Sequence, residues 1–124
     1  MRKKKVEKPL KLEERIIESI REKKGKNIIN IDLTKLNNSI CEFFIISQGE
    51  SNTQVRAIAQ NIEDKVKKHL NQNAYHTEGY ENAQWILLDY NSVVVHIFQE
   101  NMRNYYKLEE LWADGILTVY PDEE

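Results

Sequence analysis

The sequence is poor in residues that cross-link or break up a small protein. It has 1 cysteine, 2 prolines and 4 glycines among 124 residues. A single cysteine, Cys41, excludes an internal disulfide and favours a reducing, cytoplasmic setting. Its apolar runs are much shorter than the ~20 residues that a membrane-spanning helix needs. The basic N-terminus also lacks the apolar stretch of a secretory signal. We therefore expect a cytoplasmic protein that is held together by ordinary core packing.

Groups that could perform catalysis are scarce as well. Asp89 has no second carboxylate nearby with which to hold magnesium, and the spacing of His and Cys does not suit zinc. Cys41 begins an apolar run without an activating base, so we interpret it as a packing residue. Gly49-Glu50-Ser51 stands where a phosphate loop would lie, but Glu50 would repel a phosphate and no P-loop lysine follows. The sequence predicts an ordinary turn there, and a protein that is not an enzyme and needs no metal or cofactor. The alternative is a small nucleotidyl transferase that uses this turn to bind a nucleotide with magnesium.

Charge is distributed unevenly along the chain. Residues 1–26 hold 11 Lys and Arg against 5 Asp and Glu, whereas residues 27–124 hold 7 against 15. The acidic body should be attracted to basic partners and repelled by phosphate backbones. The basic run is Arg2, Lys3, Lys4 and Lys5. We expect it to belong to a flexible, solvated tail over residues 1–9, with a peripheral contact to nearby RNA as the alternative.

Periodicity of the apolar residues indicates interleaved helices and strands. Apolar side chains at helical spacing predict helices over residues 10–24, 51–71 and 101–112, where a capping box at Ser51 and Gln54 begins the second and Asn101 caps the third. Strands are expected around residues 27–33, 40–47, 74–78, 84–90 and 92–98. Residues 116–120 form either a last strand or an extended tail. A helical crossover between buried strands predicts an α/β fold of one domain, a mixed β-sheet flanked by helices.

Aromatic residues and carboxylates gather in the last third of the chain. Trp85 stands four residues before Asp89, and Tyr105 and Glu109 share a helical face with Trp112. Aromatic anchors beside carboxylates are typical of surfaces that bind other proteins. Carboxylates avoid cores, so part of this cluster should reach the surface. The helix that carries Tyr105 is left open between core, partner surface and dimer surface.

His96 lies in the apolar run Val93–Phe98. A histidine with apolar neighbours along a strand is more often a hydrogen-bonded core residue than a ligand or a catalyst. We therefore predict a structural role for it.

Five segments together resemble the ribosomal silencing factor family, also called the Iojap family. Each segment is short, but their order and spacing are specific, and the resemblance runs from about residue 10 to Trp112. The segments are Phe43-Phe44-Ile45-Ile46-Ser47-x-Gly49-x-Ser51, Glu78-Gly79, Trp85-x-x-x-Asp89-Tyr90, Val93-Val94-Val95-His96-Ile97-Phe98 and Arg103-x-x-Tyr106-x-Leu108-Glu109-x-Leu111-Trp112.

The resemblance implies a fold and a function. The fold would be nucleotidyltransferase-like without the catalytic carboxylates. Family members bind the fourteenth protein of the large ribosomal subunit, block joining of the small subunit and lower translation when nutrients run short. Organelle relatives act in ribosome assembly, so assembly of the large subunit is the alternative function for this chain. Free members form homodimers. On this chain the implied domain covers residues 10–112, followed by an acidic extension over residues 113–124.

The resemblance also suggests which residues meet the partner. Trp85 and Asp89 would form the contact, with Glu78 and Tyr90 nearby, and Tyr105 and Glu109 are further candidates. Two positions depart from the family pattern. Glu42 replaces the usual Asp, and Asn91-Ser92 replaces a Gly-Asp turn. Because Asn tolerates the left-handed backbone that Gly would supply, we expect the hairpin to be kept.

Overall fold

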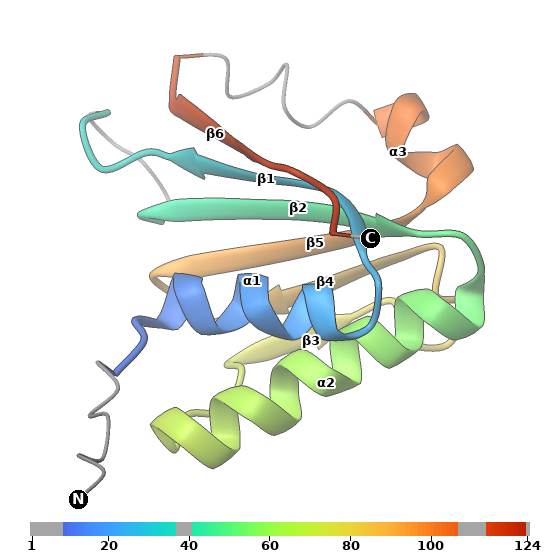
Figure 1. Ribbon diagram of the computed structural model, residues 1–124, viewed down its shortest axis with the longest axis horizontal. Helices are drawn as coiled ribbons and strands as arrows, with labels where there is room; N and C mark the ends of the chain where they lie inside the picture. The colour runs from blue at the N-terminus through green and yellow to red at the C-terminus, as the bar shows by residue number, and fades with distance from the viewer. Residues whose placement is uncertain (1–8, 37–40, 107–113, 124) are drawn as a thin grey trace, which may run out of the picture.

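The computed structural model describes residues 9–36, 41–106 and 114–123, and within them single helices separate groups of one to three strands (Figure 1). In chain order the elements are α1 (Leu12–Glu22), β1 (Lys26–Asp32), β2 (Phe43–Gly49), α2 (Asn52–Leu70), β3 (His76–Glu78), β4 (Trp85–Asp89), β5 (Val93–Gln99), α3 (Glu100–Tyr106) and β6 (Ile116–Tyr120). The basic residues 2–5, for which the sequence predicts a flexible tail, lie outside the described residues.

All of the strands belong to one sheet, in the order β3-β4-β5-β2-β1-β6. Strands β2 and β5 are parallel, and the other neighbours are antiparallel. A parallel pair requires a crossover, and α2 lies in the connection between β2 and β5. The mixed α/β sheet predicted from the sequence is therefore confirmed, whereas its likeness to nucleotidyl transferases stays a prediction.

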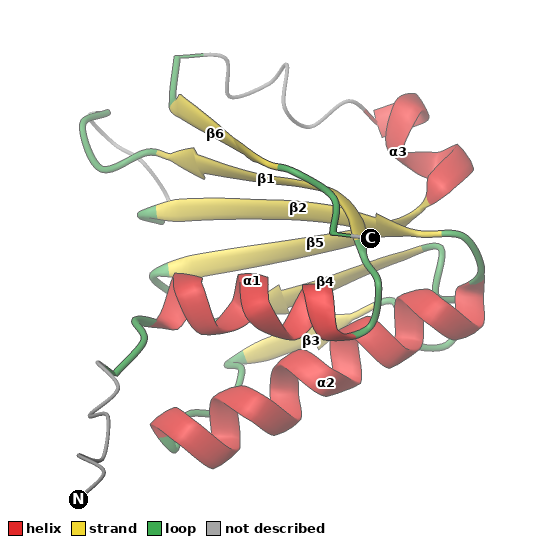
Figure 2. Cartoon of the chain, viewed as in Figure 1, coloured by secondary structure: helices red, strands yellow, loops and turns green. Residues whose placement is uncertain are grey.

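Helices α1 and α2 cover one face of the sheet (Figure 2). Their apolar stripes meet side chains of β4 and β5, and the shared core includes Ile16, Ile20, Ile58, Ile62, Val95 and Ile97. Each of these side chains is fully buried. Burial of one such side chain contributes about 1.5–3 kcal/mol, so this layer supplies much of the stability.

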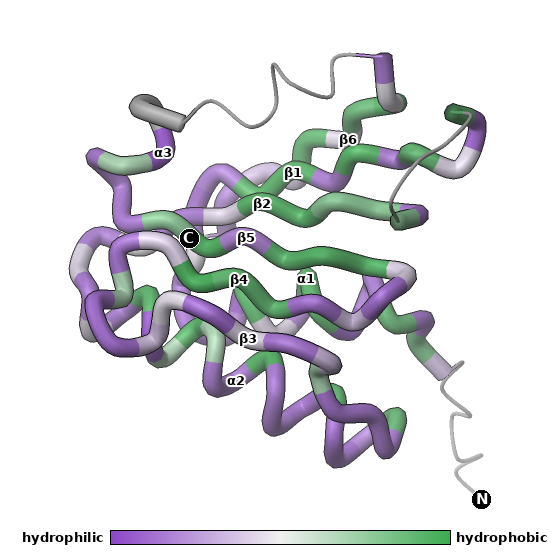
Figure 3. Tube along the Cα trace, turned by 180° about the vertical axis from the view of Figure 1, so that it is seen from behind, coloured by the Kyte–Doolittle hydropathy of each residue, from purple (hydrophilic) through white to green (hydrophobic). Residues whose placement is uncertain are grey.

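The second face of the sheet carries another apolar cluster. Ile31, Phe44, Ile46 and Phe98 are buried there, and Met102 of α3 packs against them. Figure 3 views this face and shows the hydrophobic stretches of the central strands side by side. Strand β2 therefore has buried residues on both faces, as its uninterrupted apolar sequence predicts.

Residues 116–120 form a strand and not an extended tail. Strand β6 pairs with β1 along its whole length and forms an edge of the sheet. Arg21 of α1 holds the end of this strand: its Nη2 donates to the Pro121 carbonyl at 2.9 Å, and its guanidinium lies 5.6 Å from the centre of the Tyr120 ring. The segment predicted as an acidic extension thus supplies a sheet strand.

The predicted start of the third helix is wrong by one residue. Helix α3 begins at Glu100, directly after β5, so Asn101 lies within its first turn and does not cap it. Strand and helix follow each other without a loop, which leaves no extended residue at Asn101 for a cap. The predicted continuation to Trp112 lies outside the described residues.

Candidate partner-binding face

Strand β4 separates its side chains cleanly between the two faces of the sheet. Ile86 and Leu88 are fully buried in the helix-side core. Trp85, Leu87 and Asp89 alternate with them and are only partly buried. Because side chains on one face of a strand recur every second residue, this face presents an aromatic ring, an aliphatic side chain and a carboxylate in a row.

Strand β3 extends this row sideways. Glu78 lies opposite Leu87, and His76 lies opposite Asp89, so their side chains share the face. Both are exposed, and His76 Nε2 lies 2.8 Å from Glu78 Oε1. We call the surface formed by His76, Glu78, Trp85, Leu87 and Asp89 the β3–β4 face. The structure thus brings together three residues that the sequence selected, Glu78, Trp85 and Asp89.

The indole of Trp85 is held by residues of β5. Its Nε1 donates to Nδ1 of His96 at 3.0 Å, and its ring stacks on Phe98 with a centroid distance of 5.0 Å. His96 is 5% exposed, which confirms its predicted structural role. Burial lowers the pKa of His96 to about 4, so the ring is neutral at pH 7. Since Nδ1 accepts the bond, the proton resides on Nε2, which lacks a hydrogen-bond partner among the residues that the structure describes.

Gly79 allows the chain to turn from β3 towards β4. Its φ is +91°, a conformation that side chains with a Cβ rarely adopt. A Cβ at this position would also overlap the backbone of Trp85. Glycine at position 79 therefore lets the β3–β4 connection pass close to the backbone of Trp85, where a residue with a Cβ would be disfavoured.

The turn after β4 fixes Asp89. Asn91 has a φ of +72°, and the carboxylate of Asp89 accepts the Asn91 N–H at 2.8 Å. Tyr90 N–H donates to the Val93 carbonyl at 2.9 Å and closes the hairpin. Asn91 thus supplies the left-handed backbone expected of it, and the hairpin is kept despite the departure from Gly-Asp.

The remaining predicted site residues do not lie on the described part of this face. Tyr90 is 4% exposed in the helix-side core, because it follows Asp89 and points to the opposite side of the sheet. Burial raises the pKa of Tyr90, and Glu63 adds to the effect. The side chain of Tyr105 and the whole of Glu109 lie outside the described residues, so both stay predictions.

Side chains accept two of the N–H groups at the turn before α2. Ser51 is the N-cap and accepts the Gln54 N–H at 3.1 Å, while the Gln54 side chain accepts the Glu50 N–H at 2.7 Å. This confirms an ordinary strand-to-helix turn. Cys41 is also a packing residue, since it is buried and burial raises the pKa of its thiol to about 11. Over the described ranges, no three His, Cys, Asp or Glu side chains are placed to hold a metal ion.

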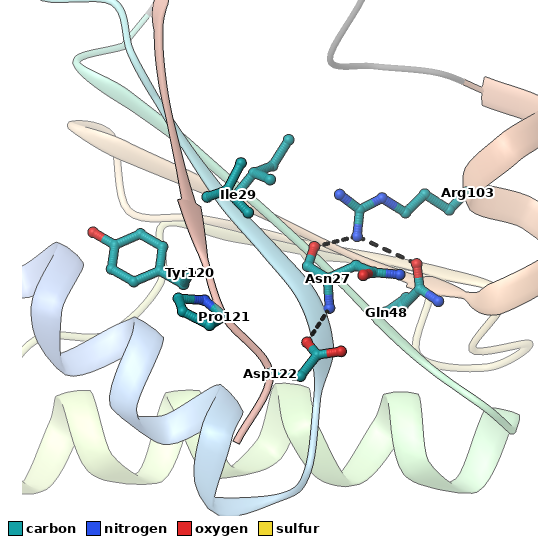
Figure 4. Close-up of a pocket in the computed structure, with 8 residues that line it drawn as sticks. Asn27, Ile29, Gln48, Arg103, Tyr120, Pro121 and Asp122 are labelled. Atoms are coloured by element: carbon teal, nitrogen blue, oxygen red, sulfur yellow. Dashed lines mark hydrogen bonds between the residues drawn. The ribbon is translucent and has the colours of Figure 1, made fainter. Parts of the chain in front are cut away.

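A second set of contacts, not foreseen from the sequence, surrounds a cavity of about 370 Å³ at one end of the second face (Figure 4). Arg103 reaches from α3 to donate to the Asn27 carbonyl and to the Gln48 side chain. Asp122 accepts the Asn27 N–H at 2.9 Å. These bonds link α3, β1, β2 and the end of the chain. Arg103 begins the segment of residues 103–112, which carries part of the resemblance. Its partners are 55 and 76 residues away in the sequence, so a local sequence pattern cannot predict these bonds.

Comparison with known proteins decides the family. The model of the family described as "Ribosomal silencing factor during starvation" matches residues 6–124. The chain belongs to the ribosomal silencing factor family. It is 38% identical to the ribosomal silencing factor RsfS of Chromobacterium violaceum over 97 residues, which cover 78% of each chain. It is 36% identical to RsfS of Bacillus subtilis over 96 residues, 77% of this chain and 80% of the relative.

Solved structures agree with this assignment. A crystal structure of a Chromobacterium violaceum protein superposes with a TM-score of 0.79 at 34% identity and covers 86% of this silencing factor and 88% of that chain. One from Bacillus halodurans gives 0.70 at 32% identity, with coverage of 91% and 96%. The chloroplastic protein Iojap of maize is 38% identical over 73 residues, 59% of this chain and 31% of the relative.

In this silencing factor the family match extends beyond Trp112, where the resemblance read from the sequence ended. The extension includes β6, which is part of the same sheet. Within the described ranges, no helix combines the length and the apolar content that crossing a membrane requires.

Proposed function

We propose that this ribosomal silencing factor binds the fourteenth protein of the large ribosomal subunit through its β3–β4 face. While it is bound, the domain blocks joining of the small subunit and lowers translation when nutrients are limited. The observation that supports this proposal is the arrangement of Trp85, Glu78 and Asp89 on one face of adjacent strands. It combines an aromatic anchor with carboxylates, the pattern expected for docking onto a basic protein.

The distance between Trp85 and Asp89 indicates which residues the partner surface must offer. Trp85 and Asp89 are four residues apart along a strand, which corresponds to roughly 13 Å. One lysine or arginine side chain cannot meet both, so each contacts a different partner residue. Glu78 lies opposite Leu87, between the two. We therefore expect a partner surface with an apolar contact for Trp85 and basic side chains for Glu78 and Asp89.

Charge supports the same class of partner. The chain beyond residue 26 has 15 acidic against 7 basic residues. Ribosomal proteins are basic, so long-range attraction favours the encounter, and repulsion keeps this surface away from bare RNA. In this proposal the protein acts by steric exclusion and not as an enzyme.

Binding can be measured by co-sedimentation with purified large subunits. Trp85→Ala removes the apolar anchor, and loss of a central anchor costs about 2 kcal/mol, roughly a 30-fold rise in Kd. Asp89→Asn removes the charge but keeps an oxygen for the Asn91 N–H, so the turn is preserved. Asp64→Asn is the matched control, because it removes one carboxylate from the exposed side of α2.

We expect weaker co-sedimentation for Trp85→Ala and Asp89→Asn and no change for Asp64→Asn. Full co-sedimentation of a folded Trp85→Ala variant would refute the assignment of the anchor. Equal weakening by Asp89→Asn and Asp64→Asn would show that general acidity, and not this face, determines binding.

A further inference from the structure

The hydrogen bond between Trp85 and His96 involves a buried histidine, and burial of its polar ring reduces the stability of the fold. His96 is 5% exposed and sits among aromatic rings: Phe44 meets it edge to face at 5.0 Å, and Phe98 lies parallel to it at 6.4 Å. Its Nε2 has no hydrogen-bond partner within the described part of the chain. A buried polar group without a partner is unfavourable, and an aliphatic side chain would fill this strand position without that penalty.

We propose that His96 is a positioning residue for the partner-binding face, which fixes the indole of Trp85 so that only its apolar ring is offered to the partner. This inference rests on the proposed function, because it concerns the orientation of the proposed anchor. Trp85 lies directly opposite Phe98, and His96 is its diagonal neighbour on β5. Stacking on Phe98 sets the plane of the indole, and the bond to Nδ1 sets which edge of the ring points inward.

The fixed orientation has a consequence for the partner. An indole has a single donor, its Nε1–H, and in this structure His96 accepts it. A partner group that meets Trp85 therefore needs methyl or methylene groups and no acceptor. Polar recognition falls to Glu78 and Asp89 on the same face. Fixing the ring before binding also reduces the conformational entropy that is lost when the complex forms.

The bond can be tested in the unaltered protein by nitrogen NMR. The indole signal of Trp85 is assigned by its absence in Trp85→Phe. We expect slow hydrogen exchange at Nε1 and a neutral His96 ring with its proton on Nε2. Fast exchange of this indole proton, or a proton on Nδ1 of His96, would overturn the proposal.

Its effect on binding is tested by a double-mutant cycle on large subunits. His96→Leu keeps the volume but removes the acceptor, and loss of one hydrogen bond predicts about tenfold weaker binding. His96→Asn places an oxygen near the position of Nδ1, so it should bind more tightly than His96→Leu. In a Trp85→Phe background the indole donor is absent, and His96→Leu should cause no further loss.

The outcomes separate this inference from the proposed function. If His96→Leu weakens binding equally in the unaltered chain and in the Trp85→Phe background, its effect does not act through the indole, and the positioning role is refuted while the function stands. If the unaltered protein fails to bind large subunits, the proposed function fails, and the partner role of His96 fails with it. The NMR result reports the bond itself in either case.

Discussion

Acid should destabilise this protein through His96 before it affects most carboxylates. Burial holds the pKa of His96 at about 4 in the folded chain, whereas an exposed histidine has a pKa of 6.5. Between these two pKa values, His96 is mostly protonated in the unfolded chain and mostly neutral in the folded chain. The stability associated with neutral His96 is therefore fully present above pH 6.5 and is lost progressively as the pH falls towards 4.

The size of this loss follows from the two pKa values. Proton linkage gives about 2 kcal/mol of lost stability between pH 7 and pH 5. Ordinary Asp and Glu side chains, with pKa values near 4, change charge mainly below pH 5, so they contribute little in this window. The loss is a substantial fraction of the 5–15 kcal/mol that stabilises a typical domain.

The assay is urea unfolding at pH 7, 6 and 5, followed by circular dichroism. His96→Asn is the matched control, since it keeps an oxygen acceptor for Trp85 and does not titrate. The unfolding free energy of the unaltered protein should fall by about 2 kcal/mol more than that of His96→Asn between pH 7 and pH 5. Parallel pH dependence in the two proteins would refute a buried, neutral His96.

Substitutions at Gly79, Asn91 and Ser51 test the local backbone conformations that the structure assigns to them. Gly79→Ala should cost about 1–3 kcal/mol in thermal or urea unfolding, since its φ of +91° and the nearby Trp85 backbone disfavour a Cβ; an unchanged midpoint would contradict this. The unfolding free energy of Asn91→Gly should stay within about 0.5 kcal/mol of the parent, whereas Asn91→Val should lose about 1–2 kcal/mol. Equal stability of the two variants would argue against the left-handed turn. Ser51→Ala should cost about 1 kcal/mol through loss of the N-cap of α2, with Ser92→Ala in the hairpin turn as a comparison that removes no such cap.

Features that depend on neighbouring residues could be predicted from the sequence. The capping box at Ser51 is a pattern of four residues, and the structure contains that N-cap. The left-handed turn at Asn91 follows from the tolerance of one residue type. Burial of β2 on both faces follows from its continuous apolar run. The structural role of His96 follows from its apolar strand neighbours, whereas its bond to Trp85 depends on the pairing of β4 with β5.

Features that depend on distant parts of the chain could not be predicted. Strand β6 shows no clear alternation, because as an edge strand it exposes Ile116, Leu117 and Val119. Only pairing with β1 distinguishes it from an extended tail. Arg103 bonds to Asn27 and Gln48 across the sheet, and no local spacing indicates these partners.

Tyr90 illustrates the limit of proximity in sequence. It adjoins Asp89, and the resemblance placed it near the partner surface. Successive residues of a strand point to opposite faces, so Tyr90 lies in the helix-side core while Asp89 lies on the β3–β4 face. Of the residues suggested for binding, Trp85, Glu78 and Asp89 are the ones that the structure brings together on that face.

A subunit-joining assay tests the proposed function most directly. Purified large and small subunits are mixed with increasing amounts of this protein, and the fraction of joined subunits is measured on sucrose gradients. The unaltered chain should prevent joining once it saturates the large subunits, and folded Trp85→Ala should need roughly 30-fold more protein for the same effect. Joining that proceeds normally at saturating unaltered protein would contradict the proposed block, and equal potency of Trp85→Ala would contradict the role of the β3–β4 face.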